Sequence, residues 1–152
     1  MDSQLAVEAA DHSVRLWLGL EDVKDVMIWA DGMIAASPNP SMAIIDLSSA
    51  FRESRSAVLA RLRTLTSTEL ETKALRMAVP DVARLVRDGV WSVTEAIESL
   101  KGVAVNLGLV GGDIATAMFV LEDSLALAAD GIFTESQLRE HFFEALERIL
   151  GE

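Results

Sequence analysis

Two histidines are the first candidates for chemistry, because each has a glutamate about one helical turn away. Glu8 precedes His12 by four residues, and Glu144 follows His141 by three. On a helix such a pair shares one face and offers two metal ligands, whereas a catalytic zinc site takes three from the protein. A di-iron site would need Glu-x-x-His, and apolar residues stand three positions before both histidines. We therefore expect surface or core-edge histidines and no bound metal.

Asp-Gly followed by apolar, aromatic and hydroxyl residues occurs twice and is similar to the second half of a calcium-binding loop. The test is whether carboxylates stand at the leading ligand positions of each loop. With Gly131 or Gly89 at the loop's glycine position, the first and third ligands fall on Ala126, Ala128, Arg84 and Val86. These side chains cannot hold a hard dication. The sequence therefore predicts no calcium site.

Other catalytic and cofactor motifs are missing from the sequence. Residues 108–112, Gly-Leu-Val-Gly-Gly, have neither the dinucleotide-binding spacing nor the Gly-Lys-Ser/Thr of a phosphate loop. No serine lies in a Gly-x-Ser-x-Gly turn. Cysteine is absent, which removes disulfides, thiolate metal sites and a cysteine nucleophile. We expect a non-enzymatic protein without a cofactor; an enzyme with a carboxylate site is the least supported alternative.

The charge of the chain is strongly acidic and uneven. The net charge is −11; residues 1–50 and residues 101–152 each contribute −6, and residues 51–100 contribute +1. Nucleic acid and anionic membranes repel such a chain, whereas basic proteins attract it. The basic cluster of residues 52–63 is expected to pair with acidic helices. The sequence therefore predicts a protein partner and no nucleic acid, with simple solubility as the alternative reason for the charge.

Two acidic helix faces are the candidate binding surfaces. One stands at the start of the second expected helix and the other lies along the last helix. The predicted partner-binding residues are Glu21, Asp22, Asp25, Trp29, Glu140, Glu144 and Glu147. The first set is preferred by a small margin, because a partly exposed Trp29 would add an apolar anchor. The competing interpretation places Trp29 at the rim of the core, as is usual for large aromatic residues.

Residues 26–48 carry a resemblance to a known group of proteins. They combine Trp-Ala-Asp at 29–31, Pro-Asn-Pro at 38–40 and Ile-Asp-Leu-Ser at 45–48. This pattern resembles small bacterial immunity proteins, which are encoded beside secreted polymorphic toxins and bind and neutralise them. Asn39 stands where such proteins carry a second proline. The resemblance implies that acidic faces of this chain bind a basic toxin domain; the alternative is a structural or adaptor bundle that self-associates through an apolar surface.

A sequence pattern typical of a helix-to-helix joint occurs twice, at residues 88–95 (the first joint) and at residues 130–137 (the second joint). Gly89 and Gly131 can take the left-handed conformation that ends a helix. Ser92 and Thr134 can cap the following helix, with a glutamate or glutamine three residues later completing a capping box. The joints start 42 residues apart, as in a paired-helix repeat, but the sequences around them differ. Two similar hairpins in a globular bundle are the preferred interpretation.

Apolar spacing and breaks predict helices along the whole chain. Gly19, the Ser-Pro-Asn-Pro turn at 37–40 and the glycines at 108–112 should end helices, and Pro80 should end or kink one near Ala78. Thr66 or Thr68 and Asp113 are the expected caps after two of these breaks. The expected helices span about 4–18, 21–36, 42–50, 51–65, 68–78, 81–88, 93–107, 114–129 and 135–149. Residues 114–129 are apolar on nearly all sides, which is typical of a central buried helix.

We therefore expect an all-α fold, a single globular bundle of antiparallel helical hairpins over residues 1–152. No low-complexity stretch or linker divides the sequence. The start of the chain has no basic segment followed by an apolar run, so no signal peptide is expected. The most apolar window, 103–121, is interrupted by polar and glycine residues near its middle. The sequence thus predicts a soluble cytoplasmic protein.

Overall fold

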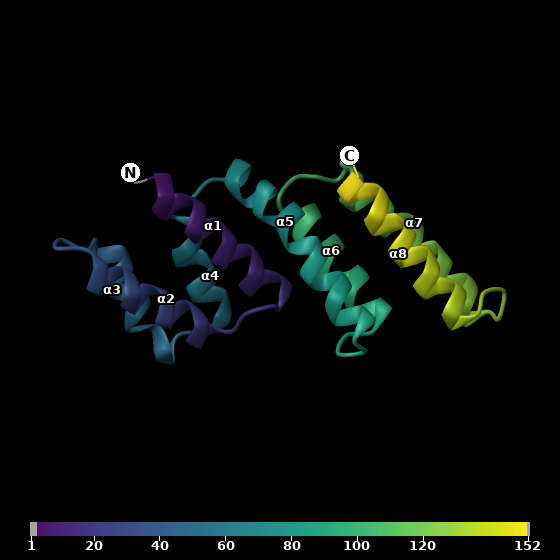
Figure 1. The fold of residues 1–152 in the computed structure, drawn as a ribbon, viewed down its shortest axis with the longest axis horizontal. Coiled ribbons are helices and arrows are strands. Elements are labelled where there is room, and N and C mark those ends of the chain that lie inside the picture. The colour runs from purple at the N-terminus through teal and green to yellow at the C-terminus, as the bar shows by residue number, and fades with distance from the viewer. Residues whose placement is uncertain (1–2, 152) are drawn as a thin grey trace. The chain divides into compact units, whose positions relative to one another are not determined.

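The chain is all-α. The computed structural model describes residues 3–151, in which eight α-helices and one 3-10 helix follow one another and no strand occurs. Figure 1 shows this order along the chain. The helices are α1 (Ser3–Leu18), α2 (Val23–Ala36), α3 (Met42–Ser48), η1 (Ala50–Arg52), α4 (Arg55–Arg63), α5 (Thr68–Arg87), α6 (Val93–Asn106), α7 (Asp113–Ala129) and α8 (Glu135–Gly151). The predicted fold class is confirmed.

The helices gather into two compact units, Met1–Ala74 and Leu75–Glu152. The boundary falls inside α5 and not in a loop, so the first turns of α5 belong to one unit and the rest to the other. The prediction of one domain over residues 1–152 stays a prediction.

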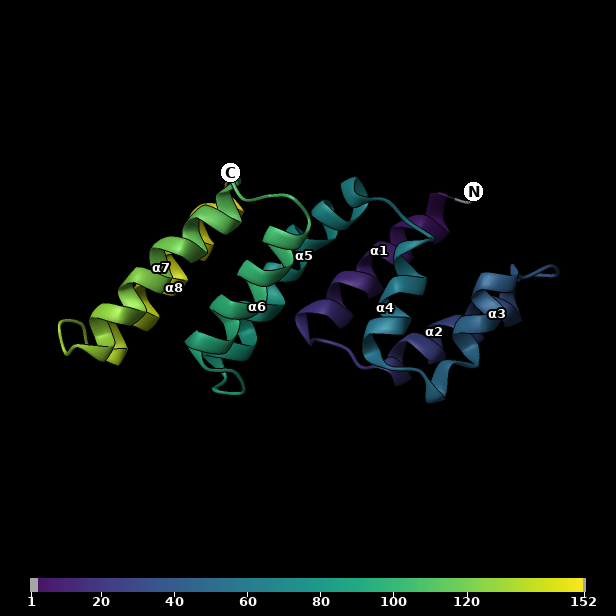
Figure 2. The same cartoon turned by 180° about the vertical axis from the view of Figure 1, so that it is seen from behind.

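The first unit is built from two pairs of packed helices. α2 packs on α3, and α1 packs on α4. Their apolar faces share one core, in which Leu16, Val26, Leu47, Val58 and Leu62 are almost fully buried. Figure 2 shows the same helices from behind. This core fixes the start of α2, where the first predicted acidic face lies.

The boundary between the third and fourth expected helices is corrected by the structure. Residues 42–50 and 51–65 were expected to be helical throughout, but α3 ends at Ser48 and α4 begins only at Arg55. The Ser54 hydroxyl accepts a hydrogen bond from the Ala57 amide at 3.1 Å, which caps α4 at that point. A serine cap satisfies an amide that the helix itself cannot, so the helix starts there.

The arginines of the 52–63 cluster are used within the first unit. Arg61 binds the Glu53 carboxylate at 2.8 Å and Asp46 at 3.7 Å, and the hydrogen bond that Arg61 donates to Glu53 raises the pKa of the guanidinium. Arg55 donates hydrogen bonds to the backbone carbonyls of Leu16 and Trp17 at the end of α1. Arg61 therefore pairs with carboxylates, as expected of the cluster, whereas Arg55 binds backbone carbonyls at the end of α1.

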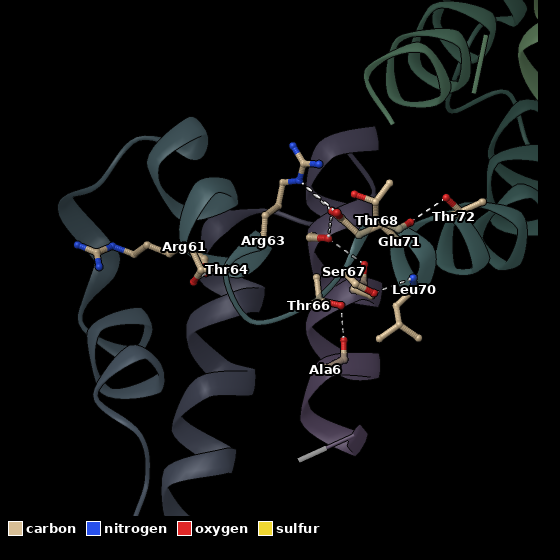
Figure 3. Close-up of polar contacts among 12 residues, drawn as sticks. Ala6, Arg61, Arg63, Thr64, Thr66, Ser67, Thr68, Leu70, Glu71 and Thr72 are labelled. Atoms are coloured by element: carbon tan, nitrogen blue, oxygen red, sulfur yellow. Dashed lines mark hydrogen bonds and ion pairs between the residues drawn. The ribbon is translucent and has the colours of Figure 1, made fainter. Parts of the chain in front are cut away.

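The start of α5 is attached to α1 through polar contacts (Figure 3). The Glu71 carboxylate is 2% exposed and accepts hydrogen bonds from Ser13 at 2.9 Å and from Arg63 at 3.1 Å. The Thr66 hydroxyl donates to the Ala6 carbonyl, and the Ser67 hydroxyl caps the helix by accepting from the Leu70 amide. The cap of α5 is therefore Ser67, and the prediction of Thr66 or Thr68 is wrong.

Pro80 does not end a helix. α5 runs without a break from Thr68 to Arg87, so the expected helices 68–78 and 81–88 are one. Proline in a helix interior removes one hydrogen bond and costs about 3 kcal/mol. Pro80 is exposed, and Val79, Val82 and Val86 beside it are fully buried, so burial of the opposite face offsets that cost.

Both joints form as the sequence predicts. Gly89 has φ +75° and Gly131 has φ +78°. Ser92 forms a capping box with Glu95, and Thr134 exchanges hydrogen bonds with Gln137 in the same pattern. The joints connect α5 to α6 and α7 to α8, and α7 packs against both α6 and α8 in the second unit. The second joint therefore places α8 alongside α7 (Figure 1).

Candidate partner-binding groove

A groove of about 550 Å³ lies between α7 and α8. The residues on its α7 side are mainly small or apolar: Gly112, Asp113, Thr116, Ala117, Val120, Leu121 and Ser124. The residues on its α8 side are His141, Glu144, Ala145, Arg148 and Ile149. The groove contains one residue of the predicted set, Glu144, and it has the size usual for ligand sites in proteins, about 300–1,000 Å³.

One end of the groove is built by the turn before α7. Gly108 ends α6 with φ +79°, and Gly112 packs so closely that an added Cβ would lie 3.2 Å from the Leu109 carbonyl oxygen. Gly112 is the N-cap, so the expectation that Asp113 caps α7 is wrong. Asp113 is the first residue of α7, and its carboxylate accepts from the Ile114 amide at 2.8 Å and from Arg76 at 2.5 Å.

Arg76 also fixes the end of α8. Its guanidinium donates to the Ile149 carbonyl at 2.6 Å as well as to the Asp113 carboxylate. One side chain of α5 thus joins the start of α7 to the end of α8. At the opposite end of the hairpin, the second joint sets the separation of the same two helices, so both ends of the groove are defined.

The prediction that residues 114–129 form a central buried helix is wrong. Ile114, Ala115, Met118 and Leu121 are buried, but Val120 is 60% exposed and Phe119 is 41% exposed. Leu127, two turns after Val120 on the same side of α7, is also exposed. The packed neighbours α6 and α8 cover only one stripe of α7, so its other apolar side chains remain at the surface. Val120 forms part of the groove wall.

α8 has the two faces that the sequence predicts. Leu138, Phe142, Leu146 and Ile149 are buried, while Glu140, Glu144 and Glu147 are exposed. None of these three carboxylates has a hydrogen bond or ion pair with another residue of the part of the chain that the structure describes. They stand at i, i+4 and i+7, so they form one acidic edge beside the groove, which we call the α8 acidic edge.

The groove also contains two side chains that can carry positive charge. Arg148 and His141 both line it on the α8 side, and the His141 ring makes an edge-on contact with Phe133 at 5.2 Å between centroids. Sequence reasoning considered His141 as a metal ligand only, and did not place Arg148 at a site. Their spacing of three and four residues from Glu144 was the available signal.

The carboxylates of the first predicted face are engaged in local contacts. Glu21 is only 13% exposed and binds His12 Nδ1 at 2.7 Å and Arg15 Nε at 3.1 Å. Asp22 and Asp25 form the capping box of α2, each accepting a hydrogen bond from the backbone amide of the other at 3.0–3.1 Å. Asp22 and Asp25 remain exposed to solvent, but each carboxylate already has a structural role.

Trp29 lies at the rim of the core. It is partly buried against the core of the first unit, and its ring packs on the His12 ring at 4.7 Å between centroids. The indole Nε1 is buried without a hydrogen-bond partner in the structure. Trp29 therefore matches the rim-of-core interpretation, and its polar atom faces the interior.

A second hollow lies beside this face. It has a volume of about 460 Å³ and is lined by Gly19, Glu21, Asp22, Val23, Lys24 and Arg55. Its charged walls are of both signs, and Arg55 and Glu21 already bind other groups. The hollow thus offers less unpaired negative charge than the α8 acidic edge.

Among residues 3–151, no group of three or more His, Cys, Asp and Glu side chains comes close enough together to hold a metal ion. Within the same residues no helix is both long enough and apolar enough to cross a membrane.

Comparison with known proteins gives no further assignment. No protein-family model matches the sequence, and neither a curated protein nor a solved structure is significantly similar to it.

Proposed function

We propose that this chain is a non-enzymatic protein that binds a cationic protein partner. The observation that carries the proposal is the α8 acidic edge: Glu140, Glu144 and Glu147 are exposed, have no ion-pair partner among residues 3–151, and lie beside a groove with apolar walls. Like charges at i, i+4 spacing destabilise a helix by a few tenths of a kcal/mol per pair. A binding role accounts for such spacing, because complementary charge speeds association and selects the partner.

The resemblance at residues 26–48 suggests what that partner does. By that resemblance, the chain is a bacterial immunity protein that neutralises a secreted toxin in the cytoplasm of the cell that makes it. A toxin domain that acts on nucleic acid needs a basic surface. An acidic protein that covers this surface would block the toxin without catalysis of its own.

The two predicted faces do not support this function equally. In the first face, the carboxylates of Asp22 and Asp25 cap α2, and that of Glu21 binds His12 and Arg15. The carboxylates of the α8 acidic edge make no such contacts among the described residues. We therefore favour Glu140, Glu144 and Glu147 over Glu21, Asp22, Asp25 and Trp29 as the contact surface. This reverses the order of preference that the sequence alone supports.

A self-associating adaptor is the second candidate, favoured by the exposed apolar side chains of α7. Phe119, Val120 and Leu127 are 41%, 60% and 37% exposed. Light scattering coupled to gel filtration distinguishes the two functions: a monomer at micromolar concentration contradicts the adaptor role.

The experiment starts from the gene next to the one that encodes this chain. Its product is expressed alone and together with this protein; growth arrest that occurs only in the absence of this protein is the expected result. A product that neither arrests growth nor binds this chain would rule out the immunity function.

Two matched charge variants then locate the surface on the complex. E140Q/E144Q/E147Q should slow association about tenfold and flatten its salt dependence. D22N/D25N is the control, because asparagine also caps helices and α2 keeps its start. An effect of D22N/D25N without an effect of the glutamine variant would move the interface to the first face.

A further inference from the structure

The groove between α7 and α8 is elongated along both helices. Its lining extends from Asp113 to Ser124 on α7 and from His141 to Ile149 on α8. At 1.5 Å per residue these segments are about 16 Å and about 12 Å long. The groove therefore matches two to three turns of a third helix laid between them.

The walls provide apolar contacts with little side-chain bulk. Ala117 and Ala145 face the groove from opposite helices, with Val120, Leu121 and Ile149 beside them. Small residues allow another backbone to approach, and the larger aliphatic residues give its side chains surface to cover. Val120 is 60% exposed, so no element of the described part of the chain covers this point of the α7 wall.

Charge is distributed unequally over the two walls. On the α7 side the polar groups are the Thr116 and Ser124 hydroxyls and Asp113, which is paired with Arg76. On the α8 side, Glu144 lies in the groove with Glu140 and Glu147 one turn to either side, and Arg148 and His141 are the opposing groups. The three glutamates outnumber Arg148, so a cationic group is attracted from the α8 side.

We propose that this groove binds one amphipathic helix of the partner, with apolar side chains between α7 and α8 and Lys or Arg along the α8 acidic edge. This rests on the proposed function and deepens it. Apolar anchors at i, i+4 and i+7 of such a helix span about 10 Å, which fits within the groove. The proposal commits to a cationic helix because the unpaired charge beside the groove is negative.

The test uses the full chain and a synthetic helical peptide of leucine, alanine and lysine, about 15 residues long so that it can form a helix. Its leucines stand at i, i+4, i+7 and i+11, and its lysines occupy one flank. The control peptide has the same composition in scrambled order. Fluorescence anisotropy should show binding at least about tenfold tighter for the amphipathic peptide than for the scrambled one. Equal binding of both would overturn the proposal, because charge alone would explain it.

Two variants of this chain locate the peptide. A117W fills the groove and should weaken binding about tenfold, whereas A126W, an exposed position on α7 that does not line the groove, should leave binding unchanged. V120N replaces an exposed apolar wall residue with a neutral polar one, adds no charge that would attract the lysines, and should also weaken binding, which keeps the test valid if A117W fails to fold. Unchanged binding to V120N and to a folded A117W would overturn the proposal. A dimer that either variant converts to a monomer would also overturn it, since the occupant would be a second copy.

The same variants separate this proposal from the proposed function. If the neighbouring gene product binds and depends on the α8 glutamates but tolerates A117W and V120N, the helix proposal is wrong and the function stands. If the amphipathic peptide binds in the groove but the neighbouring product does not bind at all, the function is wrong and the groove assignment stands.

Discussion

The start of α2 and the outer face of α8 are equally acidic in sequence but differ in what their carboxylates do. Glu21 lies between His12 and Arg15, and Asp22 and Asp25 hold the first turn of α2. The three glutamates of α8 make no such contacts among the described residues. The first set therefore contributes to folding, and the second contributes charge to the surface.

The difference has a physical origin in the turns that precede the helices. Gly19 adopts φ +94°, and the Leu20 and Glu21 amides donate to the Arg15 carbonyl, which turns the chain back toward α1. That return brings Glu21 within reach of His12 and Arg15 on α1. On α8 the glutamates lie on the side opposite the buried residues, and within residues 3–151 no cationic side chain forms an ion pair with them. Counting charges along the sequence does not distinguish these two cases.

The largest effect is expected where a fully buried carboxylate loses its cation. Arg63→Ala leaves Glu71, which is 2% exposed, with Ser13 as its side-chain partner, and should lower the free energy of unfolding by about 3 kcal/mol. Urea unfolding followed by circular dichroism measures it. Glu140→Gln is the matched change at an unpaired carboxylate and should alter stability by less than about 0.5 kcal/mol. Equal effects of the two would contradict the distinction between paired and free acids.

The next effect tests the joint that positions α8. Gly131 has φ +78°, which a β-branched residue adopts only with strain, so Gly131→Val should destabilise the protein by about 2 kcal/mol. Gly32 lies inside α2, and a Cβ added there would meet no other atom within 4 Å. Gly32→Ala should therefore raise the free energy of unfolding by up to about 1 kcal/mol. Thermal unfolding of both variants gives the comparison. Equal melting temperatures would contradict the role assigned to the second joint.

A smaller loss is expected from the cap of α2. Asp22→Ala removes the side chain that accepts from the Asp25 amide and should cost about 1 kcal/mol. Asp22→Asn keeps a capping oxygen and should cost much less, even though it removes the same charge. If both variants lose the same stability, the carboxylate acts through its charge and not through the cap.

The sequence predicts local features of this fold well, because neighbouring residues determine them. The positive φ of Gly89 and Gly131 and the capping boxes after them depend on four or five consecutive residues. Where several hydroxyl residues are adjacent, as at Thr66, Ser67 and Thr68, the sequence does not determine which of them caps the helix. Pro80 shows the limit of local rules, because burial of one face of α5 outweighs a local cost.

Features that depend on distant segments were not predictable in the same way. The exposure of Val120 depends on how many helices pack around α7. The apolar residues of 114–129 predict burial on nearly all sides, but only α6 and α8 pack on this helix within the described residues. The groove itself is a product of this incomplete cover. Glu144 was identified from its spacing on α8, but nothing in the sequence pairs it with Ala117 or Ser124 of another helix.

The smallest effect has the opposite sign and is the most direct test of the α8 acidic edge. Glu144 lies one turn from both Glu140 and Glu147. Replacing its carboxylate with a neutral amide in Glu144→Gln therefore removes two repulsive interactions. Arg148 stands four residues after Glu144, but the two make no ion pair among the described residues, so stability should rise by about 0.2–0.5 kcal/mol per relieved pair at low ionic strength. The gain should shrink in about 1 M salt, where the screening length falls to about 3 Å.

Glu21→Gln is the matched change at the first face and should lower stability, because the amide cannot replace the charge that His12 and Arg15 bind. Chemical denaturation with urea at two salt concentrations compares the variants without adding ionic strength through the denaturant. A gain for Glu144→Gln beside a loss for Glu21→Gln means that one acidic face stabilises the fold and the other carries a cost that only a partner can offset. A loss at both positions would mean that Glu144 has a partner within the folded chain, and the α8 acidic edge would no longer be a free binding surface.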